Sequence, residues 1–253
     1  FFCIISVGIT ASAARDSFFL VKYDRSILPL MFVAIAFTMY LVIPIYKSMI
    51  KSKDQIFIIS ISTTIFSLSL FLIQKSLNGY VIPLLFIWVE IINVLSVMQF
   101  WILAGEIFNP RQAKRLFSLI ASGGSFAAII SGYSIKPFVQ TYGSENLLNL
   151  SIFFLVGSLL VVQLLRGQND NAVQNSKTEG LNEIPIKLGN YLRSIAIMIG
   201  IAAFISKIID YQFKIIAVNI FPDQNQLASF FGSYYMSTGL ATIIMQFFVT
   251  SPI

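Results

Sequence analysis

The segment from Ile205 to Val218, ISKIIDYQFKIIAV, carries three charged side chains among apolar ones. Lys207 lies three residues before Asp210, and Lys214 lies four residues after it, so a helix places all three on one face. A charge at the centre of a membrane helix costs about 2.5–3.5 kcal/mol on the insertion scale. We therefore expect these side chains to face a bundle interior or a wet cavity rather than lipid.

Two interpretations of this charged face remain open. In the structural one, Asp210 neutralises Lys207 and Lys214 within the helix and holds the bundle together. In the functional one, the face belongs to a translocation path, where an acid between two lysines can exchange partners with an anionic ligand.

Charges also interrupt two other apolar segments. Arg15 and Asp16 follow a run without charges, and because helix neighbours point about 100° apart we expect this pair not to neutralise itself well. Alternatively the pair snorkels to the outer surface beside Lys22 and Arg25. Glu90 lies within LLFIWVEIINVL, where a lone carboxylate needs either a proton or a partner, such as a structural hydrogen bond to a neighbouring helix.

The composition indicates the class of protein that must position these charges. Of the 253 residues 57% are hydrophobic and 11% are charged, whereas a soluble domain has about a quarter charged residues. Long apolar runs with short polar breaks predict an all-α polytopic membrane protein. Cys3 is the only cysteine and histidine is absent, so a disulfide within the chain and His-based chemistry are excluded. We find no catalytic constellation and expect neither enzyme activity, nor a cofactor, nor a metal.

Eight apolar segments reach, or nearly reach, the roughly 20 residues needed to span a bilayer. They are residues 1–22, 27–47, 55–74, 80–107, 116–138, 145–166, 191–219 and 227–250. The sequence starts without methionine inside the first segment and ends directly after the eighth, so we expect a fragment of a longer protein. We predict a six-helix bundle over 1–166, a cytoplasmic linker over 167–190, and the first two helices of a second bundle over 191–253. This is the layout of a two-bundle secondary transporter.

The distribution of Lys and Arg predicts the orientation of these segments, because basic residues accumulate in cytoplasmic loops. The breaks after segments two, four and six hold Lys47, Lys51, Lys53, Arg111, Lys114, Arg115, Arg166, Lys177, Lys187 and Arg193. The other breaks hold only Lys22, Arg25, Lys75 and Lys136. The even-numbered breaks are thus expected in the cytoplasm. The net charge of +6 then reflects membrane topology, and we predict no nucleic-acid partner.

Two features at the start of the fifth segment have structural interpretations. Glu106 is followed by NPRQAKR, and we expect it to form an ion pair that fastens this loop. Its possible partners are Arg111, Lys114 and Arg115. The stretch GGSFAAIISG then places Gly124, Ala128 and Gly132 at intervals of four, a stripe of small residues that predicts close helix packing.

Three stretches resemble one family of membrane transporters. FWILAGEIFNPRQAKRLFSLIASGGSFAAIISG is similar to a pattern in which Phe-Trp leads to Ala-Asn-Asp/Glu, then Glu-Ala-Lys-Arg and a glycine-bearing helix. ARDSFFLVKYDRSILPLMF resembles the first helix of the same family, and IIDYQFK followed by SFFGSYYMSTGLAT resembles its seventh and eighth. The family is that of the ATP/ADP translocases of plastids and obligate intracellular bacteria.

The resemblance implies a fold and a set of roles. The family has twelve helices, is similar in architecture to the major facilitator superfamily, and exchanges ATP for ADP or other nucleotides. Arg15 would take the place of the first-helix lysine, Asp210 that of the seventh-helix glutamate and Lys214 that of its lysine partner, while Glu90 is the candidate for a fourth-helix glutamate. Because Arg replaces Lys, Asp replaces Glu and Gly105 replaces Asn, we expect a divergent bacterial member in the inner membrane.

These observations together predict a nucleotide antiporter that works by alternating access. Arg15, Lys207 and Lys214 would bind phosphates, and Asp210 and Glu90 would hold these cations when the site is empty. An aromatic side chain could stack on the base, with Phe100, Trp101 and Tyr211 as candidates. Two alternatives remain: a proton-coupled transporter of another organic anion, with Glu90 or Asp210 titrating, and a membrane sensor or scaffold without transport activity.

Overall fold

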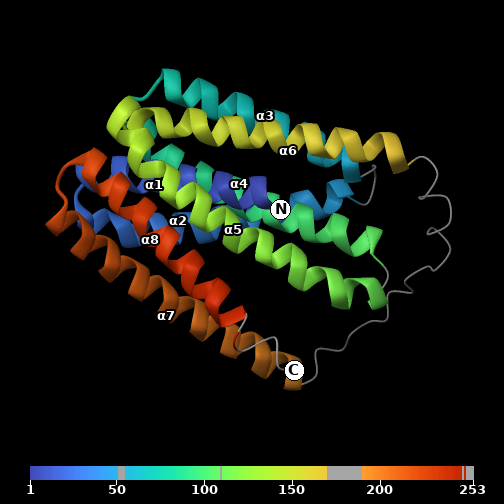
Figure 1. The fold of residues 1–253 in the computed structure, drawn as a ribbon. Coiled ribbons are helices and arrows are strands. Elements are labelled where there is room, and N and C mark those ends of the chain that lie inside the picture. Colours follow the sequence, from blue (N-terminus) through green and yellow to red (C-terminus); the bar gives the residue numbers. More distant parts are fainter. Residues whose placement is uncertain (51–54, 109, 170–189, 247, 249–253) are drawn as a thin grey trace.

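The computed structural model describes residues 1–50, 55–108, 110–169, 190–246 and 248 (Figure 1). This part of the chain forms eight long α-helices and contains no strand, which confirms the predicted all-α fold for it. The helices are α1 (Phe2–Lys22), α2 (Leu28–Ile50), α3 (Gln55–Lys75), α4 (Val81–Ile107), α5 (Pro110–Tyr142), α6 (Leu147–Asn169), α7 (Asn190–Ile220) and α8 (Gln224–Met245). Two short 3-10 turns, η1 (Arg25–Ile27) and η2 (Ser144–Asn146), precede α2 and α6.

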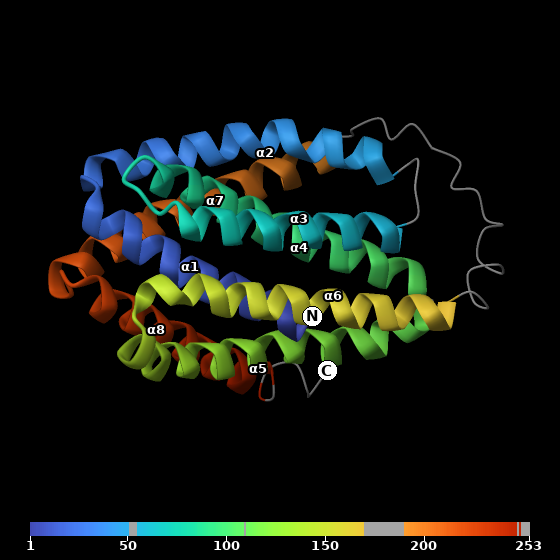
Figure 2. The same ribbon diagram turned by 90° about the horizontal axis from the view of Figure 1, so that it is seen from above.

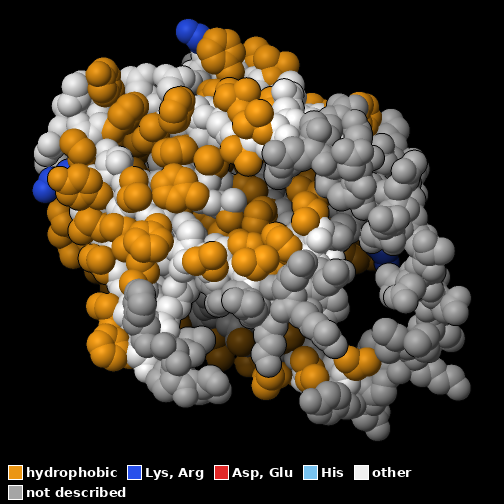
Figure 3. All heavy atoms as spheres, turned by 45° about the vertical axis from the view of Figure 1, so that its right-hand side comes forward, with side chains coloured by type: hydrophobic (Ala, Val, Ile, Leu, Met, Phe, Trp, Pro, Cys, Tyr) orange, Lys and Arg blue, Asp and Glu red, His pale blue; other side chains and the backbone are white. Residues whose placement is uncertain are grey.

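Six helices of the described residues are long and apolar enough to cross a membrane: α1, α2, α3, α4, α6 and α7. The other two predicted spans, α5 and α8, do not belong to this set. Both are rich in Ser and Gly, and α5 begins with the basic sequence PRQAKR. The outer face in Figure 3 fits a protein surrounded by lipid, because hydrophobic side chains cover most of its coloured surface and Lys and Arg lie near its edges. The chain is therefore treated as an integral membrane protein.

The helices run back and forth between two ends of the molecule. The turns α1–α2, α3–α4, α5–α6 and α7–α8 gather at the left in Figure 1, and we call this the turn end. Helices α2, α4 and α6 end, and α3, α5 and α7 begin, at the opposite end, which we call the loop end. Because the helix ends that flank the predicted cytoplasmic breaks all lie at the loop end, the helix arrangement is compatible with the orientation predicted from Lys and Arg.

Hydrogen bonds join the turns at the turn end. The Ser144 backbone N–H donates to Asn225 Oδ1 over 2.8 Å, and Gln224 Nε2 donates to the Ser144 hydroxyl over 2.8 Å. Arg25 donates to the Asn219 side chain, which connects η1 to the last turn of α7. These contacts fasten α7 and α8 to the first six helices at this end.

The centre of the bundle is α1, which packs against α4, α5, α6 and α8 (Figures 1 and 2). In α1, 78% of the residues in the most apolar 18-residue window are buried inside the protein. In α7, no residue of the corresponding window is buried. Residues 196–209 of α7 are all exposed, and the buried residues of α7, Lys214, Ala217 and Val218, lie in its second half. A charged side chain on α1 is therefore inside the protein, while one on the first half of α7 remains accessible.

Close packing of α5 on α8 depends on small residues from both helices. A Cβ atom at Gly132 would lie 2.6 Å from the backbone oxygen of Gly232, and one at Gly239 would lie 2.8 Å from Ala128 Cβ. The predicted stripe thus has two members, Ala128 and Gly132, against α8. Its third member, Gly124, instead faces the start of α1. Backbones in such contact exclude larger side chains.

The predicted ion pair of Glu106 with Arg111, Lys114 or Arg115 lies outside the described residues, because the placement of these side chains is not described. The backbone there shows that α5 begins at Pro110, six residues before the apolar segment predicted to start at 116. Proline is favoured in the first turn of a helix, and the charged residues that follow are compatible with helix outside the apolar region.

Candidate functional site

Six charged side chains from three helices form one continuous series of ion pairs, which we call the charge chain. Its members alternate in sign along the series. In order they are Asp210, Lys214, Asp16, Arg15, Glu90 and Lys207, with Arg15 and Asp16 from α1, Glu90 from α4 and the other three from α7. Three bases and three acids balance one another, so the series is neutral as a whole.

The inner part of the charge chain is removed from solvent. Lys214 Nζ lies 3.1 Å from Asp16 Oδ2 and 3.0 Å from Asp210 Oδ2. Arg15 Nε lies 3.0 Å from Asp16 Oδ1. The residues Asp16, Lys214 and Arg15 are only 2%, 5% and 6% exposed. Asp16 thus receives a cation on each of its two oxygens, which compensates for burial of its charge.

The outer part of the charge chain is looser and more accessible. Arg15 Nη1 donates to Glu90 Oε2 over 2.7 Å, whereas Lys207 Nζ lies 3.7 Å from Glu90 Oε1. The exposed fraction of the side chain rises from 20% at Glu90 to 33% at Asp210 and 52% at Lys207. Access to the charge chain therefore starts at Lys207, on the exposed part of α7.

Two phenyl rings accompany the three cations. Arg15 Cζ lies 4.5 Å and Lys214 Nζ 5.7 Å from the ring centre of Phe86 on α4. The Nζ atoms of Lys207 and Lys214 lie 5.5 and 5.7 Å from the ring centre of Phe32 on α2. Cations over aromatic faces gain electrostatic stabilisation, so these rings stabilise the three basic side chains within the bundle.

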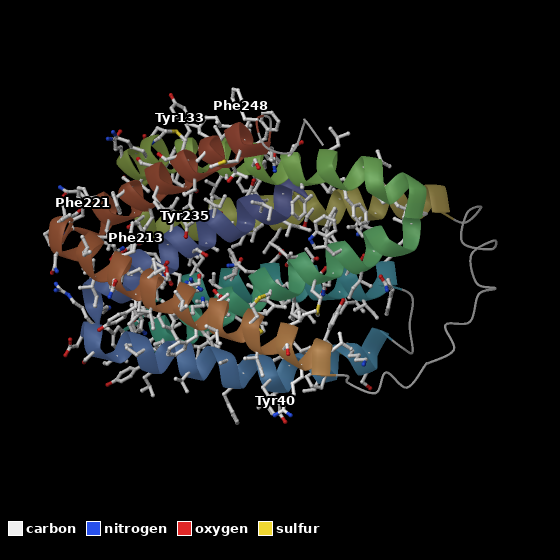
Figure 4. All side chains as sticks on the ribbon, turned by 90° about the horizontal axis from the view of Figure 1, so that it is seen from below. Tyr40, Tyr133, Phe213, Phe221, Tyr235 and Phe248 are labelled. Carbon is white, nitrogen blue, oxygen red and sulfur yellow. The ribbon has the colours of Figure 1, made fainter. Side chains whose placement is uncertain are left out.

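Tyr235 brings a fifth helix, α8, to the site. It lies on α8 where that helix faces α1 (Figure 4), and it is close enough to Asp16, Arg15 and Asp210 to interact with them electrostatically. Figure 4 also shows Phe213 and Phe221 toward the turn end of α7. Phe213 packs against Phe230 and Tyr234 with ring centres 5.8 and 4.5 Å apart, which closes this side of the site with aromatic side chains.

The structure brings together the five predicted substrate-binding residues, Arg15, Glu90, Lys207, Asp210 and Lys214, in the charge chain. The i,i+4 spacing of Asp210 and Lys214 produces the expected contact. Lys207, three residues from Asp210, reaches across to Glu90 on α4 instead.

The expectation that Arg15 and Asp16 would not neutralise each other well was wrong, because Arg15 Nε donates to Asp16 Oδ1 over 3.0 Å. The alternative, in which the pair snorkels to the surface, is contradicted by the burial of both side chains, at 6% and 2% exposure. Each has its further partner on another helix, Glu90 for Arg15 and Lys214 for Asp16.

Sequence reasoning missed Asp16, Phe32, Phe86 and Tyr235 as members of the site. Asp16 could have been found, since any acid within an apolar segment is a candidate for a functional position. The aromatic residues carry no such signal, because membrane helices contain many rings that only pack. The predicted stacking candidates Phe100 and Trp101 lie against each other and against Phe1, with ring centres 4.7–5.5 Å apart.

Comparison of this chain with protein-family models, with curated proteins and with solved structures gives no match.

Proposed function

We propose that this protein is a secondary transporter, a nucleotide antiporter that carries its anionic substrate past the charge chain by alternating access. The observation that supports this proposal most is the alternating series of three bases and three acids within membrane-length helices α1, α4 and α7. Charged residues inside membrane segments are rare and mark substrate or ion pathways.

A purely structural role explains this series less well. Burying ion pairs is a poor way to stabilise a protein, because well-packed hydrophobic residues of similar volume are often as good or better. An all-structural network also needs no accessible member, whereas side-chain exposure in this series rises from 2% at Asp16 through 20% at Glu90 to 52% at Lys207. Graded access from an exposed cation to a buried one suits a ligand that enters from one side.

The signs of the charges favour an anionic substrate. Lys207 and Lys214 offer compact ammonium groups, and Arg15 offers a planar fork that can bind a phosphate through two hydrogen bonds. In the empty state Glu90, Asp16 and Asp210 hold these cations, which prevents unpaired buried charge. A phosphate group would replace one or more carboxylates as the partner.

The fold supports an alternating-access mechanism for this substrate. Hydrogen bonds at Ser144 and Asn219 close the turn end between α1–α6 and α7–α8, while the first half of α7 is exposed toward the loop end. We propose that this arrangement is the cytoplasm-open state of a major-facilitator-like protein, with the loop end in the cytoplasm as Lys and Arg predict. The family resemblance implies the remaining parts of the proposal. These are that the substrate is a nucleotide, that transport is an exchange, and that the full-length protein has twelve helices.

Counter-exchange tests the proposal directly. Full-length protein is placed in liposomes that contain ATP, and uptake of labelled ADP is measured against liposomes without internal nucleotide. We expect rapid uptake that requires internal nucleotide and is unchanged by an imposed pH gradient. If the folded protein takes up no nucleotide, the proposal is contradicted. Uptake of another organic anion that follows the pH gradient would favour the proton-coupled alternative.

A further inference from the structure

The two phenyl rings of the site have different surroundings. Phe86 is fully buried and packs against Phe19, with ring centres 4.7 Å apart, so its ring has no room for a ligand. Phe32 is only partly buried, and the described aromatic side chains include no ring partner for it. The face of the Phe32 ring is available once its lysines move.

Phe32 is also the point where two lysines meet. Lys207 and Lys214 are two helical turns apart on α7, yet both Nζ atoms lie within 5.7 Å of the Phe32 ring centre. An anion that binds both ammonium groups must therefore lie beside this ring. Whatever is attached to the anion then lies within reach of the ring face, because both ammonium groups lie within 5.7 Å of the ring centre.

A phenyl ring is a suitable exchange partner at this position. In the empty site the ring, which carries no net charge, stabilises both ammonium groups. When an anion draws the lysines away, the ring face becomes free for a flat aromatic group, which stacks on it favourably. An aliphatic side chain could perform neither of these two roles.

We propose that Phe32 is the residue that selects substrates whose anionic group carries a flat aromatic ring system, such as a nucleobase. This inference rests on the proposed transport function and adds to it how the uncharged part of the substrate is recognised. The lysines bind the phosphates, and Phe32 distinguishes a nucleotide from a bare polyphosphate of equal charge.

Binding of ATP and of inorganic tripolyphosphate to the purified full-length protein tests this inference. In the wild type we expect ATP to bind more tightly than tripolyphosphate. Phe32→Leu should weaken ATP binding about tenfold relative to tripolyphosphate binding, the size of one stacking contact. Phe32→Trp should retain tight ATP binding. The matched control is Phe37→Leu, a change on the same helix at a side chain that is 64% exposed.

The possible outcomes separate this inference from the proposed function. Equal loss of ATP and tripolyphosphate binding in Phe32→Leu would overturn the inference, since the ring would then act only through the lysines. Unchanged ATP binding, or equal affinity of the wild type for both ligands, would overturn it as well. A wild-type protein that binds neither ligand would contradict the proposed function itself, and the inference with it.

Discussion

Lys214 Nζ lies 3.1 Å from Asp16 Oδ2 and thereby joins α7 to the central helix α1. Both residues are more than nine-tenths buried. This contact connects the two helices that carry most of the charge chain, and it lies on the turn-end side of Lys207. Any movement that opens the turn end between α1 and α7 must lengthen it.

The first prediction concerns the stability contributed by this ion pair. Lys214→Met leaves Asp16 with one buried partner fewer, and removal of one member of a buried pair costs about 3–5 kcal/mol. Thermal unfolding of the detergent-purified protein should show a clearly lowered Tm. The double variant Asp16→Asn, Lys214→Met removes both charges and should recover most of the loss.

The control for this prediction is Lys136→Met, which removes an exposed lysine near the turn end of α5. It should change the Tm little, because an exposed charge contributes little to stability. A double variant as unstable as Lys214→Met would contradict the direct coupling of the two charges.

The second prediction concerns the carboxylate that competes with substrate. Glu90 contacts both Arg15 and Lys207, at 2.7 and 3.7 Å. Glu90→Gln should therefore raise the affinity for an anionic substrate, because the substrate no longer has to displace a carboxylate from Arg15 and Lys207. The same change should slow turnover, because these ion pairs no longer re-form when the substrate is released. Equilibrium binding and exchange rates measure the two effects. Lower affinity in this variant would show that Glu90 does not compete with the substrate.

The third prediction concerns the hydrogen bonds at the turn end. Ser144 and Asn225 are close enough for a backbone-to-side-chain hydrogen bond of 2.8 Å, so cysteines at both positions should form a disulfide on mild oxidation. The cross-link would hold the turn end closed, and exchange in liposomes should stop and recover on reduction. Ser144→Cys alone serves as the control, since the native Cys3 lies at the opposite end of α1 from this turn. Full exchange by the cross-linked protein would mean that the turn end need not open there.

The fourth prediction concerns the contact between α5 and α8. A methyl group at Gly132 would lie 2.6 Å from backbone atoms of α8, so Gly132→Ala must push the helices apart and should lower the Tm. Gly123→Ala is the matched control on the same helix, because a Cβ atom there meets nothing within 4 Å. That change should be neutral or stabilising, as Ala is favoured over Gly in helices by about 1 kcal/mol. Equal effects of the two changes would contradict close packing at Gly132.

Helix positions could be predicted from the sequence because each membrane segment is a long apolar run with polar ends. The predicted segment 80–107 coincides with α4 and the predicted segment 191–219 with α7 to within a residue at each end. The largest error is at α5, which starts at Pro110 rather than 116. Apolar length marks where a helix enters lipid, and says nothing about how far it continues in water.

The candidate site could be predicted only in part. Charges within apolar segments identified Arg15, Glu90, Lys207, Asp210 and Lys214, because each is too costly to face lipid. Their partners depend on which helices are adjacent, and this information is not local. The pairing of Lys207 with Glu90 rather than with Asp210 is determined by the distance between α7 and α4. The position of the Phe32 ring beside both Lys207 and Lys214 is likewise a property of the packed bundle.

The measurement that tests the charge chain most directly is nucleotide counter-exchange by the double variant Asp16→Asn, Lys214→Met. This variant is expected to fold and insert, because the two most buried charges of the pair are removed together and Asp210, which loses Lys214, is one-third exposed. It nevertheless lacks a buried cation of the site. We predict that the variant is ordered and correctly inserted, and that its exchange rate is below about a tenth of the wild-type rate. A tenfold lower rate corresponds to a rise of about 1.4 kcal/mol in the free energy of the transition state. Exchange at the wild-type rate would show that the charges at Asp16 and Lys214 only hold the bundle together.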